Sequence, residues 1–280
     1  MTSLRALVPE AATRWWIVRP RTIFEHPRLG AALSRSYDDA GERALIDRAA
    51  RVGYDVRTVE RALIAQTREG ELAVGLGSFD AARIVALLWE RLLPPRRRGD
   101  GARGVARVEG VLGRAPVAVA VDAACGAAAW AEGDTRLVDR VIAARAPTPE
   151  SDSPAVLRAH AEVGGARERE ILGALAPRTT SVDLEGAIAD AGLALDLTLH
   201  GAFTPADLPG LRARVDAIAR SELLRAMGAD AWARGDAITT RADNATLSVR
   251  LTLPWSALDA LSDVLRGRVA QRAPHDTQGF

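Results

Sequence analysis

The chain alternates apolar and polar residues in three segments, and each segment leads into a helix-like pattern. In Leu193–His200 every odd position is leucine, while the even positions are Ala, Asp, Thr and His. Leu247–Leu253 and Leu72–Ser78 alternate in the same manner. Because successive side chains of a strand point to opposite faces, each segment is predicted to be a strand with one face against a core.

An aromatic residue and a helix-capping residue follow each of these strands. The three pairs are Phe79 with Asp80, Phe203 with Thr204, and Trp255 with Ser256. The side-chain oxygen of Asp, Thr or Ser can accept a hydrogen bond from the first helical turn, and the aromatic residue before it fixes the angle of entry. Apolar residues then recur at spacings of three and four, which predicts a helix after each strand.

Both halves of the chain contain the same predicted order of strand, helix, hairpin and helix. In the first half the predicted elements are a strand at Trp15–Arg19, helices at Pro27–Tyr37, Gly41–Val52, Asp80–Leu93 and Thr135–Ala144, hairpins at Ala62–Ser78 and Val105–Val121, a polar loop at Arg96–Gly104 and a short strand at Ala127–Trp130. In the second half they are a helix-prone stretch at Ala155–Leu175, hairpins at Val182–His200 and Ala237–Leu253, and helices at Thr204–Met227 and Ser256–Arg268.

This order predicts an α+β protein built from two related ferredoxin-like halves. Each half is expected to hold a mainly antiparallel sheet with its helices packed on one face. The proline-rich stretch 147–154 is predicted to link an N-terminal α+β unit, residues 1–146, to a C-terminal α+β unit, residues 155–280. The C-terminal unit is expected to fray from about residue 270.

The composition is that of a globular chain without a dominant electrostatic partner. Hydrophobic residues make up 48% and charged residues 26% of the 280 residues, and the net charge is +1 at pH 7. No apolar run reaches the ~20 residues that a transmembrane helix needs. The one basic cluster, Arg96–Arg103, has no aromatic residues arranged for base stacking, so a nucleic-acid partner is not expected.

Lysine and cysteine are the residues whose scarcity excludes most chemistry. The chain has no lysine, which excludes P-loop NTPases, protein kinases and pyridoxal-phosphate enzymes. Cys125 is the single cysteine, which excludes an internal disulfide, a cysteine zinc site and an iron–sulfur cluster. Its small neighbours predict a packed residue in a strand or turn. We therefore expect no cofactor and no bound metal.

A pair of glycines follows the first alternating strand, where a dinucleotide-binding fingerprint would lie. Gly75 and Gly77 match its first two glycines, but the third is missing. Asp80 at the start of the next helix would also repel a pyrophosphate. We interpret the two glycines as a tight turn with close backbone packing.

The four histidines, His26, His160, His200 and His275, show no zinc-site spacing. His160 is interpreted as a surface residue of a helix. His200 ends an alternating strand on the same face as Asp196, so these two are the candidate catalytic carboxylate–histidine pair. The alternative is a solvated sheet face near a turn, because two polar residues do not by themselves make a site.

Adjacent tryptophans, Trp15 and Trp16, stand out in a chain with only 4% aromatic residues. On a strand, one ring would face the core and the other would face outward. The pair is therefore a candidate contact surface. The alternative is that a neighbouring helix covers both rings, because tryptophans are highly buried on average.

Several segments taken together resemble a known group of proteins. The segments are Gly53–Val56, the Ala62–Ser78 hairpin, Gly77–Ala82 at the start of a helix, and the opening Leu7–Ala12. They resemble a family of uncharacterised bacterial envelope proteins with duplicated α+β domains, which often carry a lipoprotein signal. The resemblance implies an extracytoplasmic, tethered and non-catalytic protein, although this sequence has neither the signal nor the lipid-bearing N-terminal cysteine.

Two functions are consistent with these observations. The first is a non-catalytic, envelope-associated binding or structural module whose partner is a protein or a small ligand. The second is a hydrolase-like enzyme with a carboxylate–histidine site near Asp196 and His200. The location is expected to be the periplasmic side of the envelope if a signal and a lipid tether were trimmed, and the cytoplasm otherwise.

Overall fold

The chain consists of two compact units. The structure, a computed structural model, describes residues 3–36, 53–101, 104–144, 154–219, 238–242 and 245–259. Unit 1 comprises Met1–Thr22 and Arg43–Ser153, and unit 2 comprises Ile23–Glu42 and Pro154–Phe280. Ile23–Glu42 thus groups with unit 2, and not with the N-terminal unit as its place in the sequence predicts. Residues 147–153, the predicted helix at 41–52 and the predicted tail lie outside the described residues.

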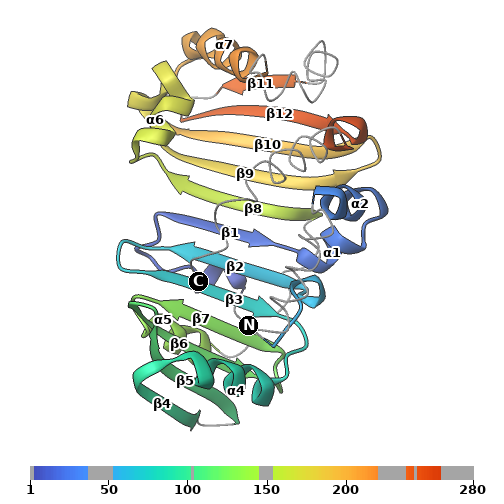
Figure 1. Cartoon of the computed structure of the whole chain (residues 1–280). Helices are drawn as coiled ribbons and strands as arrows, with labels where there is room; N and C mark the ends of the chain where they lie inside the picture. The colour runs from blue at the N-terminus through green and yellow to red at the C-terminus, as the bar shows by residue number, and fades with distance from the viewer. Residues whose placement is uncertain are drawn as a thin grey trace, which may run out of the picture. The chain divides into compact units, whose positions relative to one another are not determined.

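Unit 1 contains an antiparallel sheet in the order β1-β2-β3-β7-β6-β5-β4 (Figure 1). The strands are β1 (Arg14–Val18), β2 (Arg61–Gln66), β3 (Glu71–Leu76), β4 (Leu93–Gly101), β5 (Val105–Leu112), β6 (Ala115–Asp122) and β7 (Ala127–Glu132). The short helical segments α1 (Pro20–Glu25) and η2 (Val56–Thr58) lie between β1 and β2 in the chain, and α1 crosses the boundary between the units. The β2–β3 and β5–β6 hairpins are those that the alternating pattern predicts.

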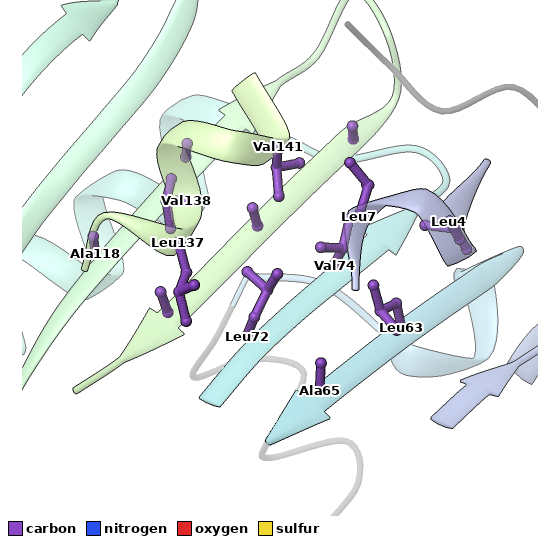
Figure 2. Close-up of a cluster of buried hydrophobic side chains, with 14 of the residues drawn as sticks. Leu4, Leu7, Leu63, Ala65, Leu72, Val74, Ala118, Leu137, Val138 and Val141 are labelled. Carbon is purple, nitrogen blue, oxygen red and sulfur yellow. The ribbon is translucent and has the colours of Figure 1, made fainter. Parts of the chain in front are cut away.

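Helices cover both faces of the unit 1 sheet. On one face, the 3-10 helix η1 (Leu4–Leu7) and α5 (Leu137–Ala143) pack in one core with sheet residues such as Leu72, as Figure 2 shows. On the other face, α4 (Ala81–Arg91) packs in a second core. Residues 117–121 of β6 are all buried and contribute to both cores. Helices on one face are therefore a wrong prediction for unit 1, because a strand buried on both sides needs a layer on each side.

The segment predicted as a polar loop, Arg96–Gly104, belongs largely to strand β4. This strand pairs with β5, with Arg97 opposite Glu109 and Arg98 opposite Val108. The loop prediction is wrong because proline and glycine are depleted in strands, so the local sequence hides an element that pairing with β5 stabilises.

Unit 2 contains an antiparallel sheet in the order β8-β9-β10-β12-β11 (Figure 1). The strands are β8 (Ala155–Glu162), β9 (Thr179–Ala189), β10 (Gly192–Gly201), β11 (Ile238–Ala242) and β12 (Thr246–Pro254). The helical segments are α2 (Pro27–Ser36), α6 (Ala166–Leu172), η3 (Gly173–Arg178), η4 (Pro205–Asp207), α7 (Leu208–Ala219) and residues 255–259. A core around Leu199 and Leu247 joins α6, η3 and α7 to β10 and β12.

Strand β8 occupies the first part of the stretch Ala155–Leu175, which the sequence analysis predicted to be helix-prone. Helix α6 forms only within its later part. Alanine, glutamate and arginine favour a helix locally. The pairing of β8 with β9 along most of its length overrides this preference. The helical interpretation of His160 is therefore wrong, and the residue lies on the sheet.

The first strand–aromatic–cap junction has the predicted local structure. Asp80 caps α4, because its Oδ1 accepts a hydrogen bond from the backbone N–H of Arg83 at 3.0 Å. The ring of the buried Phe79 lies so close to Gly75 that a Cβ there would be 3.0 Å from it, and a Cβ on Gly77 would be 3.1 Å from the Thr58 carbonyl oxygen. Close packing, and not a phosphate-binding loop, explains both glycines.

The two junctions of unit 2 follow the same plan with different contacts. Phe203 is 2% exposed, and the backbone N–H of Thr204 donates to Asp207 Oδ2 at 2.9 Å. Trp255 is half-buried, and its indole Nε1 donates to the Asp190 carbonyl oxygen at 2.9 Å. Phe203 thus anchors the start of its helix by burial, and Trp255 anchors the start of its helix by a hydrogen bond.

Candidate functional site

A carboxylate between two imidazoles lies on the sheet of unit 2. His160 comes from β8, Asp183 from β9 and His200 from β10. His160 Nδ1 lies 2.7 Å from Asp183 Oδ1, and His200 Nε2 lies 2.6 Å from Asp183 Oδ2. The strand register places His160 directly opposite Asp183 and His200 one diagonal step away. Each carboxylate oxygen therefore accepts a hydrogen bond from a different ring.

The hydrogen bonds define which nitrogen of each ring carries the proton. An ionised carboxylate only accepts, so the neutral His160 ring holds its proton on Nδ1 and the neutral His200 ring on Nε2. The opposite nitrogens, His160 Nε2 and His200 Nδ1, then keep their lone pairs. A carboxylate that fixes an imidazole in one tautomer also supports histidines that act as bases or metal ligands. Solvent reaches the cluster, since the Asp183 side chain is 45% exposed.

A row of charged side chains crosses the same face beside this cluster. Arg158, Glu185, Asp196 and Arg250 lie opposite one another on β8, β9, β10 and β12. Arg158 Nε lies 3.2 Å from Glu185 Oε2, and Arg250 donates to both oxygens of Asp196, at 2.6 and 3.1 Å. These hydrogen bonds to the Asp196 carboxylate, and its negative charge, raise the pKa of Arg250 above its ordinary value. The two acids meet at the centre of the row, and each pairs with the arginine on its outer side.

The structure does not join the two residues that the sequence analysis proposed as a carboxylate–histidine pair. Asp196 binds Arg250, and His200 binds Asp183. The pairing of Asp196 with His200 is wrong because cross-strand partners in register compete with a residue four positions away on the same strand. Asp183 is the residue that the sequence analysis missed, and the signal for it was the turn before Gly192, which sets the register of β9 against β10.

Replacing Asp183 with asparagine tests how much this cluster stabilises unit 2. The variant Asp183→Asn keeps the shape but loses the charge that strengthens two hydrogen bonds, so we expect the free energy of unfolding to fall by about 1 kcal/mol. Asp196→Asn is the matched control: its partner Arg250 is 71% exposed, and the loss should be smaller. Urea denaturation measures both. Equal losses in the two variants would contradict a special role for Asp183.

The two tryptophans of β1 differ in exposure. Trp15 is 7% exposed and belongs to the core of unit 1, and the Arg5 guanidinium lies 4.1 Å above its ring. Trp16 points to the other face and is half-buried. Of the two rings, only that of Trp16 is exposed enough to belong to the candidate contact surface.

The single cysteine lies at the surface of unit 1. Cys125 is exposed in the β6–β7 turn, where its backbone N–H donates to Asp122 Oδ1 at 3.0 Å.

Within the described ranges, no three His, Cys, Asp or Glu side chains are arranged to bind a metal ion. No helix of these ranges is long and apolar enough to span a bilayer. A depression of about 20 Å³ in unit 1, lined mainly by apolar residues such as Val105 and Val141, has room for little more than one water molecule.

Comparison with known proteins gives a likeness of fold. No family model and no curated protein matches the sequence. Crystal form III of TP0453 aligns over 93% of this chain and 96% of that chain, with a TM-score of 0.52 and 12% identity. Crystal form I covers the same shares at a TM-score of 0.53 and 12% identity. At this identity the likeness concerns the fold alone, and the chain is an α+β protein with mainly antiparallel sheets.

Proposed function

We propose that this chain is a non-catalytic, envelope-associated module whose role is binding or structural. The charged face of the unit 2 sheet supports the non-catalytic part of this proposal, and the envelope location rests on the sequence resemblance. Asp183, Glu185 and Asp196 each contact a cationic or imidazole side chain of a neighbouring strand. A carboxylate engaged in this way ties neighbouring strands together, which is a structural role.

We further propose that the two units are related halves. In each unit a single strand is followed by a hairpin, an aromatic-capped helix, and a last strand that pairs with the second strand of the hairpin. In unit 1 these strands are β1, β2, β3 and β7, and in unit 2 they are β8, β9, β10 and β12. A common order both along the chain and across the sheet supports duplication of one plan of strand, hairpin, helix and strand. The pair β4 and β5 would then be an addition to unit 1.

Complementation tests the absence of catalysis. In the native host, a deletion strain would receive the wild-type gene or the His200→Ala variant, with folding checked by circular dichroism. A structural or binding module tolerates the loss of one half-buried imidazole, so we expect His200→Ala to restore the phenotype. A folded His200→Ala protein that fails to complement would contradict the proposal.

Failure of that kind would instead support a hydrolase-like enzyme. The structure favours this second candidate only through the carboxylate–imidazole contact, and it moves the acid from Asp196 to Asp183. His200 would act as the base and Asp183 would orient its ring. An enzyme of this kind predicts that Asp183→Asn and His200→Ala abolish the same activity, while Asp196→Asn retains it.

Fractionation tests the proposed location. The gene would be expressed from its genomic start in the native host, and membrane, periplasmic and cytoplasmic fractions would be probed with an antibody. We expect the protein in the envelope fractions. Full-length protein found only in the cytoplasm would remove the envelope claim and leave the non-catalytic claim to the complementation experiment.

A further inference from the structure

The outer edge of β4 carries three consecutive arginines. Among the described strands, β4 pairs only with β5, so it forms the edge of the unit 1 sheet (Figure 1). Arg96, Arg97 and Arg98 are all exposed. The main-chain N–H and C=O groups that point away from β5 have no neighbouring strand in the described part of unit 1, which is the arrangement that accepts an added strand.

The arginines project to both faces of the sheet. Arg98 lies opposite Val108, which belongs to the core under α4, and Arg97 lies opposite Glu109 on the other face. Arg96 is held in place, because its guanidinium stacks over the Trp89 ring at 4.5 Å and its Nη1 donates to the Trp89 carbonyl oxygen at 2.9 Å. An added strand would therefore meet positive charge above and below its own plane.

Two of the nearby acids, Glu109 and Asp139, are engaged by Arg107. Arg107 donates from Nε to Glu109 Oε1 at 2.7 Å and also forms an ion pair with Asp139 of α5. Among the residues described, no carboxylate pairs with Arg97 or Arg98. Arg97 and Arg98 therefore carry positive charge that is available to a partner, although the whole chain has a net charge of only +1.

We propose that this edge binds an extended, acidic segment of a partner protein, which adds as a strand beside β4. Main-chain hydrogen bonds would hold the segment, and alternate acidic side chains would meet the arginines on each face. Pro94 and Pro95 have no N–H to donate, so the paired stretch begins at Arg96. The inference concerns unit 1 and does not depend on the proposed role of the unit 2 face.

Two other partners fit this edge less well. A second copy of β4 paired about Arg97 would place arginine opposite arginine, and like charges directly opposite each other destabilise a strand pair. Single-stranded nucleic acid uses aromatic rings as stacking platforms, whereas Arg96 already stacks over Trp89, the aromatic side chain beside this edge. An acidic peptide can form hydrogen bonds with the open main-chain edge and can also pair with the arginines.

A labelled ten-residue peptide, Glu-Glu-Val-Val-Glu-Glu-Val-Val-Glu-Glu, has glutamates on both faces when extended and provides the test. Its binding to the full chain is measured by fluorescence anisotropy at low salt. We expect micromolar binding that weakens as salt rises. The variant Arg97→Glu/Arg98→Glu should bind about tenfold or more weakly. The control Arg68→Glu/Arg114→Glu makes the same change in net charge at two exposed turn positions of unit 1, and should change the affinity less than about twofold.

The backbone contribution is tested with the same peptide methylated on every amide nitrogen, which blocks both of its edges and should remove most of its affinity if a strand is added. Equal binding of the methylated peptide, equal losses in the two double variants, or tighter binding of a single-stranded oligonucleotide would overturn the proposal. If Arg97→Glu/Arg98→Glu does not fold, Arg97→Gln/Arg98→Gln replaces it and should weaken binding in the same direction.

Discussion

Leu72→Ala is expected to lower the free energy of unfolding by about 2–5 kcal/mol. Leu72 of β3 is 0% exposed and lies in the core of unit 1 beneath η1 and α5 (Figure 2). Its cross-strand neighbours are Ala65 and Ala131, both fully buried. These two small side chains cannot extend into the space that the leucine leaves, so the substitution creates a cavity as well as losing buried apolar surface.

The control for this prediction is Leu93→Ala, which makes the same chemical change on β4. Leu93 is 52% exposed, and the loss should be within about 0.5 kcal/mol. Urea denaturation followed by circular dichroism measures both variants. A loss below about 1 kcal/mol for Leu72→Ala, or equal losses for the two variants, would contradict the assignment of Leu72 to a close-packed core.

Strands whose sequences alternate regularly could be predicted from the sequence. β3, β10 and β12 are examples, since their alternation is regular and one face of each contacts a core. β8 could not be predicted, because residues 155–162 resemble a helix until β9 supplies a partner. β4 could not be predicted either, because its proline and glycine residues indicate a loop. An edge strand tolerates them, since it pairs on one side only.

The candidate site shows the same division between local and non-local information. The turn before Gly192 pairs Gly192 with Ala189, and counting outward from it places Thr198 opposite Asp183 and so brings His200 near Asp183. That half of the site was accessible from the sequence. His160 was not, because its contact with Asp183 depends on the pairing of β8 with β9 across helical segments α6 and η3.

Gly133→Ala is the other substitution with a large expected effect, about 3 kcal/mol or more. Gly133 follows β7 with φ +84°, a backbone conformation that costs an L-residue roughly 1–2 kcal/mol. A Cβ at this position would also lie 2.1 Å from the Glu69 carbonyl oxygen and 2.9 Å from Gly70 Cα. Both atoms belong to the backbone of the β2–β3 turn, so the turn itself would have to move.

Alanine substitutions at two further glycines distinguish the cost of backbone strain from the cost of steric overlap. Gly113 has φ +66° and open space where a methyl group would lie, so Gly113→Ala should cost only the backbone strain, roughly 1–2 kcal/mol. Gly164 has open space and no positive φ, so Gly164→Ala should be neutral or stabilising by up to about 1 kcal/mol. Urea denaturation ranks the three variants. Gly133→Ala and Gly113→Ala could instead lower the free energy of unfolding equally. That result would show that the β2–β3 turn moves without cost, and would contradict its close approach to the end of β7.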